Sequence, residues 1–213
     1  MQTYVVRVWI PDRPGALGAV ASRIGAVHGD VVGIDILERG ADRAIDELTV
    51  ELPDEGLVEL LVNEIQAVDG VAVEDIRPTR DGLRDPRLDA LETAATLVAC
   101  TSADDLLSSL VKHAVRDFGG DWAVVLDDRD AVLRAVEGPA PEAPWLLAFV
   151  QGSSSSEAVA SGRAGPDELA WAALPSANLH LVIGRSGRQL RAVERRQVAA
   201  LASIADARCA EIS

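Results

Sequence analysis

The hydrophobic period of the chain changes across residues 11–15, and this change constrains the fold more than any other feature. Before it, side chains alternate in the pattern of a strand from Tyr4 to Ile10. After it, apolar residues recur at helical spacing, at Leu17, Val20, Ala21, Ile24 and Val27. The sequence therefore predicts a strand that turns at once into a packed helix, with Gly29 as the C-terminal cap of that helix.

The same two periods continue to residue 76. Strands are predicted at 31–38, 44–52 and 71–76, a turn at 40–42, and a second helix after Pro53-Asp54-Glu55. The order is β-α-β-β-α-β, which is typical of the split βαβ arrangement with both helices on one face of the sheet. We interpret residues 1–78 as one α+β domain of this ferredoxin-like type, with its second strand at an edge of the sheet.

A segment rich in proline and charge, 79–87, is predicted to be a linker to a second domain, 88–213. The second domain opens with a helix whose expected inner face is Leu88, Leu91, Ala95 and Val98. Thr101-Ser102 is expected to cap a second helix. Further predictions are a hairpin at 122–126 and 131–136, a short helix at 144–151, a loop at 152–165, strands at 168–174 and 179–184, and a closing helix at 191–212.

Composition excludes several classes of function. The formal net charge of −14 disfavours nucleic acid and anionic membranes as partners. No apolar run approaches the roughly 18 residues that span a bilayer, and the first residues do not resemble a secretory signal. Two separated cysteines and three isolated histidines give no metal-ligand spacing. We therefore expect a cytoplasmic protein with reduced cysteines and no bound metal.

No catalytic pattern stands out in the sequence. Ser153 to Ser156 lies outside any nucleophile motif, and no acid–base pair or phosphate-binding loop can be inferred. We expect no enzymatic activity, no catalytic residues and no cofactor. An enzyme with an unfamiliar site stays open, and a pocket that gathers two or more titratable groups would reveal it. Trp122, Trp145 and Trp171 are expected to fill the core, with a tryptophan-lined pocket as the alternative.

The turn before the first helix allows two interpretations. It reverses the chain only, or it presents backbone N–H groups to a small anion, because the start of a helix leaves these donors unpaired and carries partial positive charge. Gly15 has no Cβ, Ala16 has only a methyl group, and Pro14 suits a first helical turn. Asp12 is expected to cap the helix or to accept a bond from a ligand ammonium group. Trp9 provides either an apolar wall beside the turn or a side chain on the strand face.

The β-α-β-β-α-β order, together with the residues DRPGALG at 12–18, resembles the ACT domain across residues 3–77. The resemblance implies a regulatory module that pairs with a second copy and binds an amino acid or a similar small molecule at the interface. It implies ligand contacts from the turn and from the second strand of the partner. These residues are Asp12, Pro14, Gly15, Ala16, Leu17, Val32, Gly33, Ile34 and Asp35.

Pairing has an independent argument from the second strand, VVGIDIL at 31–37. This strand contains neither lysine nor proline, the residues that block association at a sheet edge. An apolar edge of this kind is covered or paired. We expect it to pair with a second copy of the chain, and the alternative is that the second domain covers it.

The second domain, 88–212, resembles a divergent GAF domain in its element order, in the strand HLVIG at 180–184 and in the segment 187–207. The resemblance implies a sensory or dimerising module. The expected protein is thus a non-enzymatic homodimeric sensor of a small molecule, most simply an amino acid, that signals through its GAF-like half to an unknown protein partner. The alternative is a scaffold that binds no ligand and regulates its partner by protein–protein contact.

Overall fold

The computed structural model describes residues 1–40, 42–79, 85–157 and 166–212. The chain divides into two compact units, Met1–Arg84 and Asp85–Ser213, here called unit 1 and unit 2. Each contains a four-stranded antiparallel sheet with helices, so the predicted α+β fold class is confirmed. Residues 80–84 of the predicted linker lie outside the described residues.

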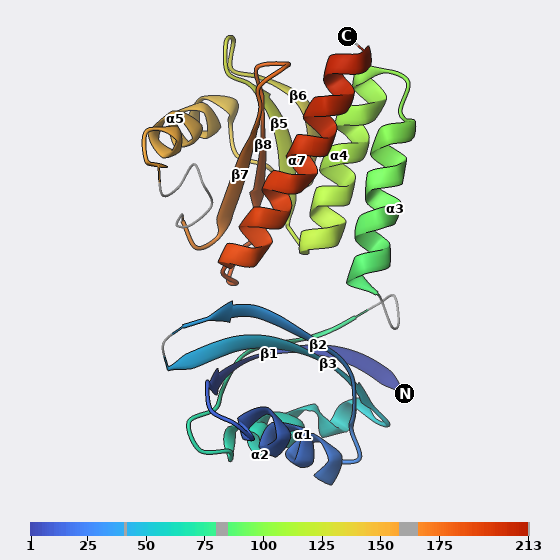
Figure 1. Ribbon diagram of the computed structural model, residues 1–213, viewed down its shortest axis with the longest axis vertical. Helices are drawn as coiled ribbons and strands as arrows, with labels where there is room; N and C mark the ends of the chain where they lie inside the picture. Colours follow the sequence, from blue (N-terminus) through green and yellow to red (C-terminus); the bar gives the residue numbers. More distant parts are fainter. Residues whose placement is uncertain (41, 80–84, 158–165, 213) are drawn as a thin grey trace. The chain divides into compact units, whose positions relative to one another are not determined.

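Unit 1 has the predicted β-α-β-β-α-β order. Its elements are β1 (Gln2–Pro11), α1 (Ala16–Ala26), β2 (Asp30–Arg39), β3 (Arg43–Leu52), the 3-10 turn η1 (Glu55–Leu57), α2 (Val58–Gln66) and β4 (Ala72–Pro78). The strands lie in the order β2-β3-β1-β4, which places β2 at an edge. Both helices cover the same face of the sheet (Figure 1).

Alternation along β1 and β3 separates the two faces of this sheet. Val6 and Val8 of β1 pack with Val20 and Ile24 of α1 in one buried cluster, as the helical spacing predicted. Residues between them point to the opposite face. There the Arg7 guanidinium pairs with the Glu47 carboxylate at 2.8 Å.

The predicted C-terminal cap of α1, Gly29, is wrong. The C-cap is Val27, and the left-handed residue after it is His28, at φ 60°. Gly29 is needed for a different reason, because a Cβ there would lie 2.9 Å from Cγ2 of Ile24. Close packing against α1, and not a left-handed cap, therefore explains this glycine.

Unit 2 is a three-layer arrangement. Its elements are α3 (Pro86–Ala99), α4 (Ala103–Phe118), β5 (Trp122–Asp127), β6 (Val132–Glu137), α5 (Ala143–Ser154), β7 (Leu169–Leu174), β8 (Leu179–Gly184) and α7 (Ala192–Ile212). The strand order is β6-β5-β8-β7. Helices α3, α4 and α7 lie on one side of this sheet and α5 on the other (Figure 1). Ser102 caps α4 as predicted, accepting the N–H of Asp105 at 3.2 Å.

The predicted inner face of α3 is wrong. Leu88, Leu91 and Val98 are 53%, 69% and 55% exposed, and Ala95 is also exposed. The buried residues are Thr93 and Leu97. Thr93 can be buried because its hydroxyl group donates to the Asp117 carboxylate of α4 at 2.7 Å. The packed face of α3 thus combines an apolar contact at Leu97 with a hydrogen bond to α4 at Thr93.

Helix α5 is longer than predicted. It runs to Ser154, so Gly152 and Ser153 are helical where a loop was expected, and Ser153 is buried. Residues 158–165 of that predicted loop lie outside the described residues. Trp145 was expected in the core but is 50% exposed, and its ring stacks on Phe149 with centroids 6.0 Å apart.

Candidate functional site

The turn between β1 and α1 has the geometry of an accessible helix start. Gly15 is the N-cap of α1 in the left-handed region, at φ 86°, with no side-chain cap. Residues other than glycine rarely adopt this conformation, because their Cβ is crowded there. A Cβ at Gly15 would have no atom within 4 Å, so the space in front of the helix is open.

Several amides of this turn are left without acceptors. The Ala16 N–H bonds to the carbonyl of Arg13 at 3.3 Å, and the Ala19 N–H bonds to that of Gly15 at 2.9 Å. For the N–H groups of Gly15, Leu17 and Gly18, the described part of the chain provides no acceptor. These donors and the positive end of the helix dipole can hold a carboxylate or phosphate oxygen.

The expected helix cap at Asp12 is wrong. Its backbone N–H bonds to the carbonyl of Asp42 at 3.0 Å, but its side chain is exposed and does not cap α1. The helix begins three residues later than an Asp12 cap requires, because Gly15 takes the cap position. Pro14 likewise precedes the cap and does not lie in the first helical turn. Of the two expectations for Asp12, contact with a ligand is the one that remains.

Trp9 does not form a wall beside the open amides. It alternates with Val8 and Ile10, which are both buried under the helices. Its side chain therefore lies on the opposite face of the sheet, where it stands across from Ile45 of β3. The strand-face alternative agrees with this register.

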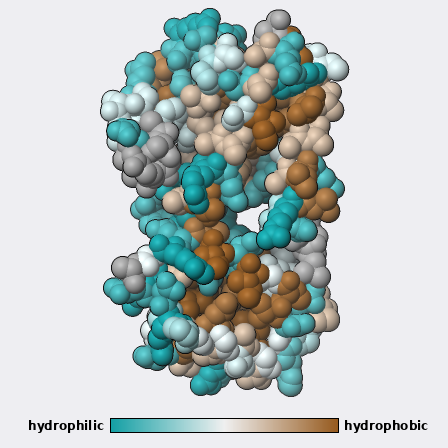
Figure 2. Space-filling model, viewed as in Figure 1, coloured by the Kyte–Doolittle hydropathy of each residue, from teal (hydrophilic) through white to brown (hydrophobic). Residues whose placement is uncertain are grey.

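The second group of predicted site residues lies together on the edge strand β2. Val32 falls at a register shift, and Gly33, Ile34 and Asp35 stand opposite Thr49, Leu48 and Glu47. In the described part of the chain, β2 pairs with β3 alone. Ile34 and Ile36 are 45% and 46% exposed. Figure 2 shows hydrophobic side chains gathered on the visible face of unit 1.

Sequence reasoning missed Asp46. This residue of β3 stands across from Val8 and Ile36, so it lies on the face covered by the helices. Its side chain is 5% exposed, and Oδ1 has no hydrogen-bond partner in the described structure. Burial raises the pKa of the Asp46 carboxyl group, the negative charge of Asp12 raises it further, and the Arg39 guanidinium opposes both. A signal was present in the sequence, because Asp46 interrupts an alternating face that continues with Leu48, Val50 and Leu52.

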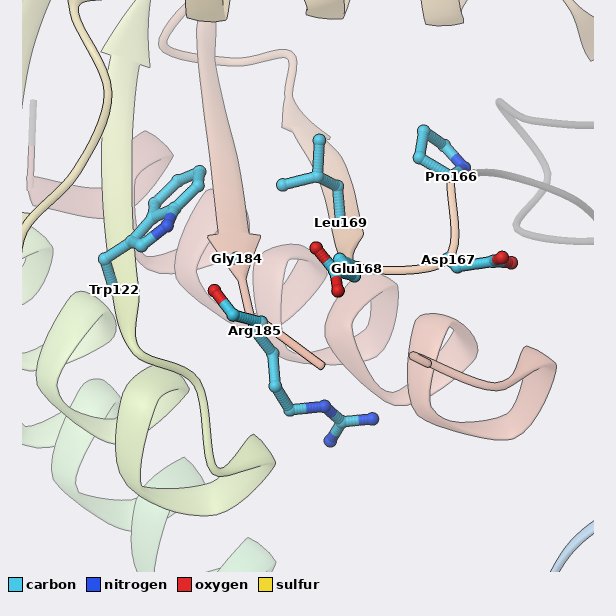
Figure 3. A pocket seen from close by; sticks show the side chains of 8 residues that line it. Trp122, Pro166, Asp167, Glu168, Leu169, Gly184 and Arg185 are labelled. Atoms are coloured by element: carbon cyan, nitrogen blue, oxygen red, sulfur yellow. The ribbon is translucent and has the colours of Figure 1, made fainter. Parts of the chain in front are cut away.

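Unit 2 contains a pocket of about 400 Å³ beside Trp122 (Figure 3). Its wall includes the charged residues Asp167, Glu168 and Arg185. The Arg185 side chain extends away from Trp122 and binds the Glu194 carboxylate at 2.7 Å. Glu168 accepts the N–H of Gly187 at 2.6 Å. Two of the three charged side chains thus hold the loop before α7.

Two further features are absent from the described residues. No group of three or more histidine, cysteine, aspartate or glutamate side chains there is arranged to bind a metal ion. Among the described helices, none combines the length and the apolar character that crossing a membrane requires.

Comparison with solved structures gives distant similarities. The C-terminal domain of the MgtC protein from Mycobacterium tuberculosis is 20% identical at a TM-score of 0.32, over 40% of this chain and 95% of that one. A formyltetrahydrofolate deformylase from Pseudomonas putida is 18% identical at a TM-score of 0.28, over 42% of this chain and 36% of that one. An unknown protein from Galdieria sulphuraria is 13% identical at a TM-score of 0.32, over 62% and 75% of the two chains.

Comparison with curated proteins found no match. The GAF-like resemblance of residues 88–212 stays a prediction. A family model does match inside unit 1, at residues 4–70, and it describes the ACT domain. ACT domains are regulatory modules that bind small molecules, often amino acids, and they often dimerise. The predicted ACT resemblance is therefore confirmed for residues 4–70.

Proposed function

We propose that this protein is a non-enzymatic sensor whose unit 1 binds an amino acid at the interface of a homodimer. The observation that carries the proposal is the open turn before α1, where Gly15, Leu17 and Gly18 offer amides to an anion. A ligand carboxylate bound there replaces the water on these donors and interacts favourably with the helix dipole. The ACT match at residues 4–70 supports the same function.

Pairing through β2 completes the proposed site. Side-by-side association of two β2 strands would satisfy their outer backbone groups and cover Ile34 and Ile36. It would also bring residues 32–35 of one copy to the interface that the ligand shares. Substitution Ile36→Lys is expected to give monomers in sedimentation velocity. The matched control is Leu60→Lys on α2, because Leu60 is also 46% exposed, and it is expected to leave the dimer intact.

In this proposal the protein signals because the ligand changes the populations of two dimer geometries. A ligand that binds one dimer geometry more tightly than another shifts the equilibrium between them, whereas equal affinity for both would shift nothing. The GAF-like unit 2 then transmits the change to an unknown protein partner in the cytoplasm.

A thermal-shift screen with the twenty standard amino acids tests the binding step. A ligand at a hundred times its Kd stabilises the folded protein by about 2.7 kcal/mol. We expect one or a few amino acids to raise Tm, and we expect Gly15→Val to abolish that rise because its side chain fills the approach to the amides. The matched control is Gly187→Val in unit 2, another left-handed glycine with no atom within 4 Å of a Cβ. That variant should keep the rise.

The second candidate function is a scaffold that binds no ligand, and the exposed isoleucines of β2 favour it. The two functions differ in one measurement. The sensor predicts that an amino acid raises Tm of the dimer, whereas the scaffold predicts a dimer whose Tm no amino acid changes.

A further inference from the structure

Apart from the exposed Asp12, the proposed site so far accounts only for the carboxylate of an amino acid. The amides of the turn recognise a carboxylate, and they would accept any small anion of the right size. Selection of an amino acid requires an acceptor for the ammonium group as well. Unit 1 has a buried carboxylate with an unused oxygen atom close to this turn.

Strand register places Asp46 near the end of β1, where the turn before α1 begins. Asp46 stands across from Val8, and the next pair on the same face is Ala44 with Ile10. One residue beyond Ile10, β1 ends at Pro11 and the turn begins. Ala16, the first residue of α1, is buried in the same cluster as Val8 and Ile10. The Asp46 carboxylate therefore lies on the helix-covered face, toward the end of β1 that leads into the turn, and close enough to feel the charge of Asp12.

Two charged residues act on Asp46, and both belong to the surroundings of the turn. Asp12 lies in the turn itself, and Arg39 ends β2 opposite Ala44. Asp12 and Arg39 are exposed, whereas Asp46 is only 5% exposed. An unpartnered oxygen on a buried carboxylate is costly, because its lost hydration is not replaced.

We propose that Asp46 binds the ammonium group of the ligand whose carboxylate occupies the Leu17 and Gly18 amides. This inference rests on the proposed function. It adds a requirement on the ligand, which must carry an amine beside its carboxylate. Asp12, of the same charge, adds to the attraction for the ammonium group. Simple carboxylic acids would satisfy the amides and leave Asp46 unpartnered.

The test compares each of the twenty amino acids with its deaminated acid, which has hydrogen in place of the ammonium group. Thermal shift and calorimetry on the full chain provide the readout. We expect an amino acid to raise Tm of the wild type, and we expect the matching deaminated acid to bind about 10- to 100-fold more weakly, the range for a charge-assisted hydrogen bond. Asp46→Asn should weaken amino acid binding by a similar factor.

Asp46→Asn is expected to fold, because it keeps the shape of the side chain and removes a buried charge. Circular dichroism and hydrogen exchange check the fold. The matched control is Asp30→Asn, an exposed aspartate at the other end of β2 that should leave binding unchanged. Equal binding of amino acid and deaminated acid, or full binding by folded Asp46→Asn, would overturn the role of Asp46 and leave the anion site standing. A wild type whose Tm responds to no compound of either class would overturn the anion site and the Asp46 proposal together.

Discussion

Gly15 and Gly187 are both left-handed glycines that precede a helix, and their turns differ in what meets the backbone amides. Gly15 precedes α1 in unit 1 at φ 86°, and Gly187 precedes α7 in unit 2 at φ 71°. At both positions a Cβ would have no atom within 4 Å. In unit 2, the N–H groups of Ser186 and Gly187 bond to the carboxylates of Asp121 and Glu168 at 2.7 and 2.6 Å.

The turn of unit 2 is sealed further by a buried ion pair. The Arg185 guanidinium binds both Glu194 oxygens and also donates to the carbonyl of Phe118 at 2.8 Å. Glu194 in addition accepts the N–H of Arg191 at 2.8 Å. The turn of unit 1 has no comparable carboxylate among the described residues. A turn that supplies its own anions needs no ligand for its donors, whereas a turn that leaves its donors open can accept one, as we propose for unit 1.

Glu194→Gln is expected to have the largest effect on stability, because it removes the ion pair with Arg185 beside the turn of unit 2. Removing the charge leaves the Arg185 guanidinium buried without its ionic partner. We expect a loss of about 3–5 kcal/mol in the free energy of unfolding. Urea denaturation measures it, and hydrogen exchange should place the loss in α7 and β8. A loss under about 1 kcal/mol would show that the ion pair does not hold this turn.

Gly15→Ala and Gly187→Ala compare the two glycines directly. Each places a Cβ on a left-handed residue, so we expect both variants to lose about 1–2 kcal/mol of stability. Only Gly15→Ala should also weaken amino acid binding, because its methyl group lies at the open amides. Urea denaturation and calorimetry separate the two effects. Equal binding by both variants would remove the distinction between the turns.

The pH dependence of stability should differ in sign between two carboxylates, one in each unit. The pKa of Asp46 is raised by burial, so its contribution to stability is greatest at low pH and is lost as the pH rises through the folded-state pKa. Hydrogen bonds from Arg134 and from the Arg129 N–H lower the pKa of Asp127. The contribution of Asp127 is therefore present above the unfolded-state pKa and is lost as the pH falls.

Urea denaturation of wild type, Asp46→Asn and Asp127→Asn across acid and neutral pH checks these signs. Relative to wild type, Asp46→Asn should gain stability as the pH rises, and Asp127→Asn should lose it. Parallel curves for wild type and Asp46→Asn would mean that Asp46 has the same pKa in the folded and unfolded states.

Asp12→Ala should have the smallest effect on stability. Asp12 is exposed and does not cap α1, so we expect a change within about 0.5 kcal/mol. An N-cap aspartate would cost about 1 kcal/mol on the same substitution. Thermal unfolding distinguishes these values, and a loss near the larger one would restore capping, one of the two roles that the sequence left open for Asp12.

Local patterns predicted unit 1 well. The change of period at residues 11–15 located β1 and α1, because strand alternation and helical spacing are both readable from neighbouring residues. Gly15 was identified in the same stretch because it has no Cβ, and the structure adds that it is left-handed. The edge position of β2 followed from the order of the elements.

Long-range packing set the limit of the prediction. The spacing of Leu88, Leu91 and Val98 defines a face of α3, but it does not say that α4 and α7 pack against another face. The Thr93–Asp117 bond on the packed face joins residues 24 positions apart. Asp46 was missed for a related reason. An acid in an alternating strand is usually solvated, and the tertiary fold shows that this one is only 5% exposed.

The most direct measurement follows backbone amides by NMR in the isotope-labelled full chain, as each standard amino acid is added. Binding to the open turn predicts that the Leu17 and Gly18 resonances shift with a saturable dose dependence, while those of Ser186 and Gly187 stay in place. Leu17 and Gly18 resonances that stay fixed with all twenty amino acids would contradict the account.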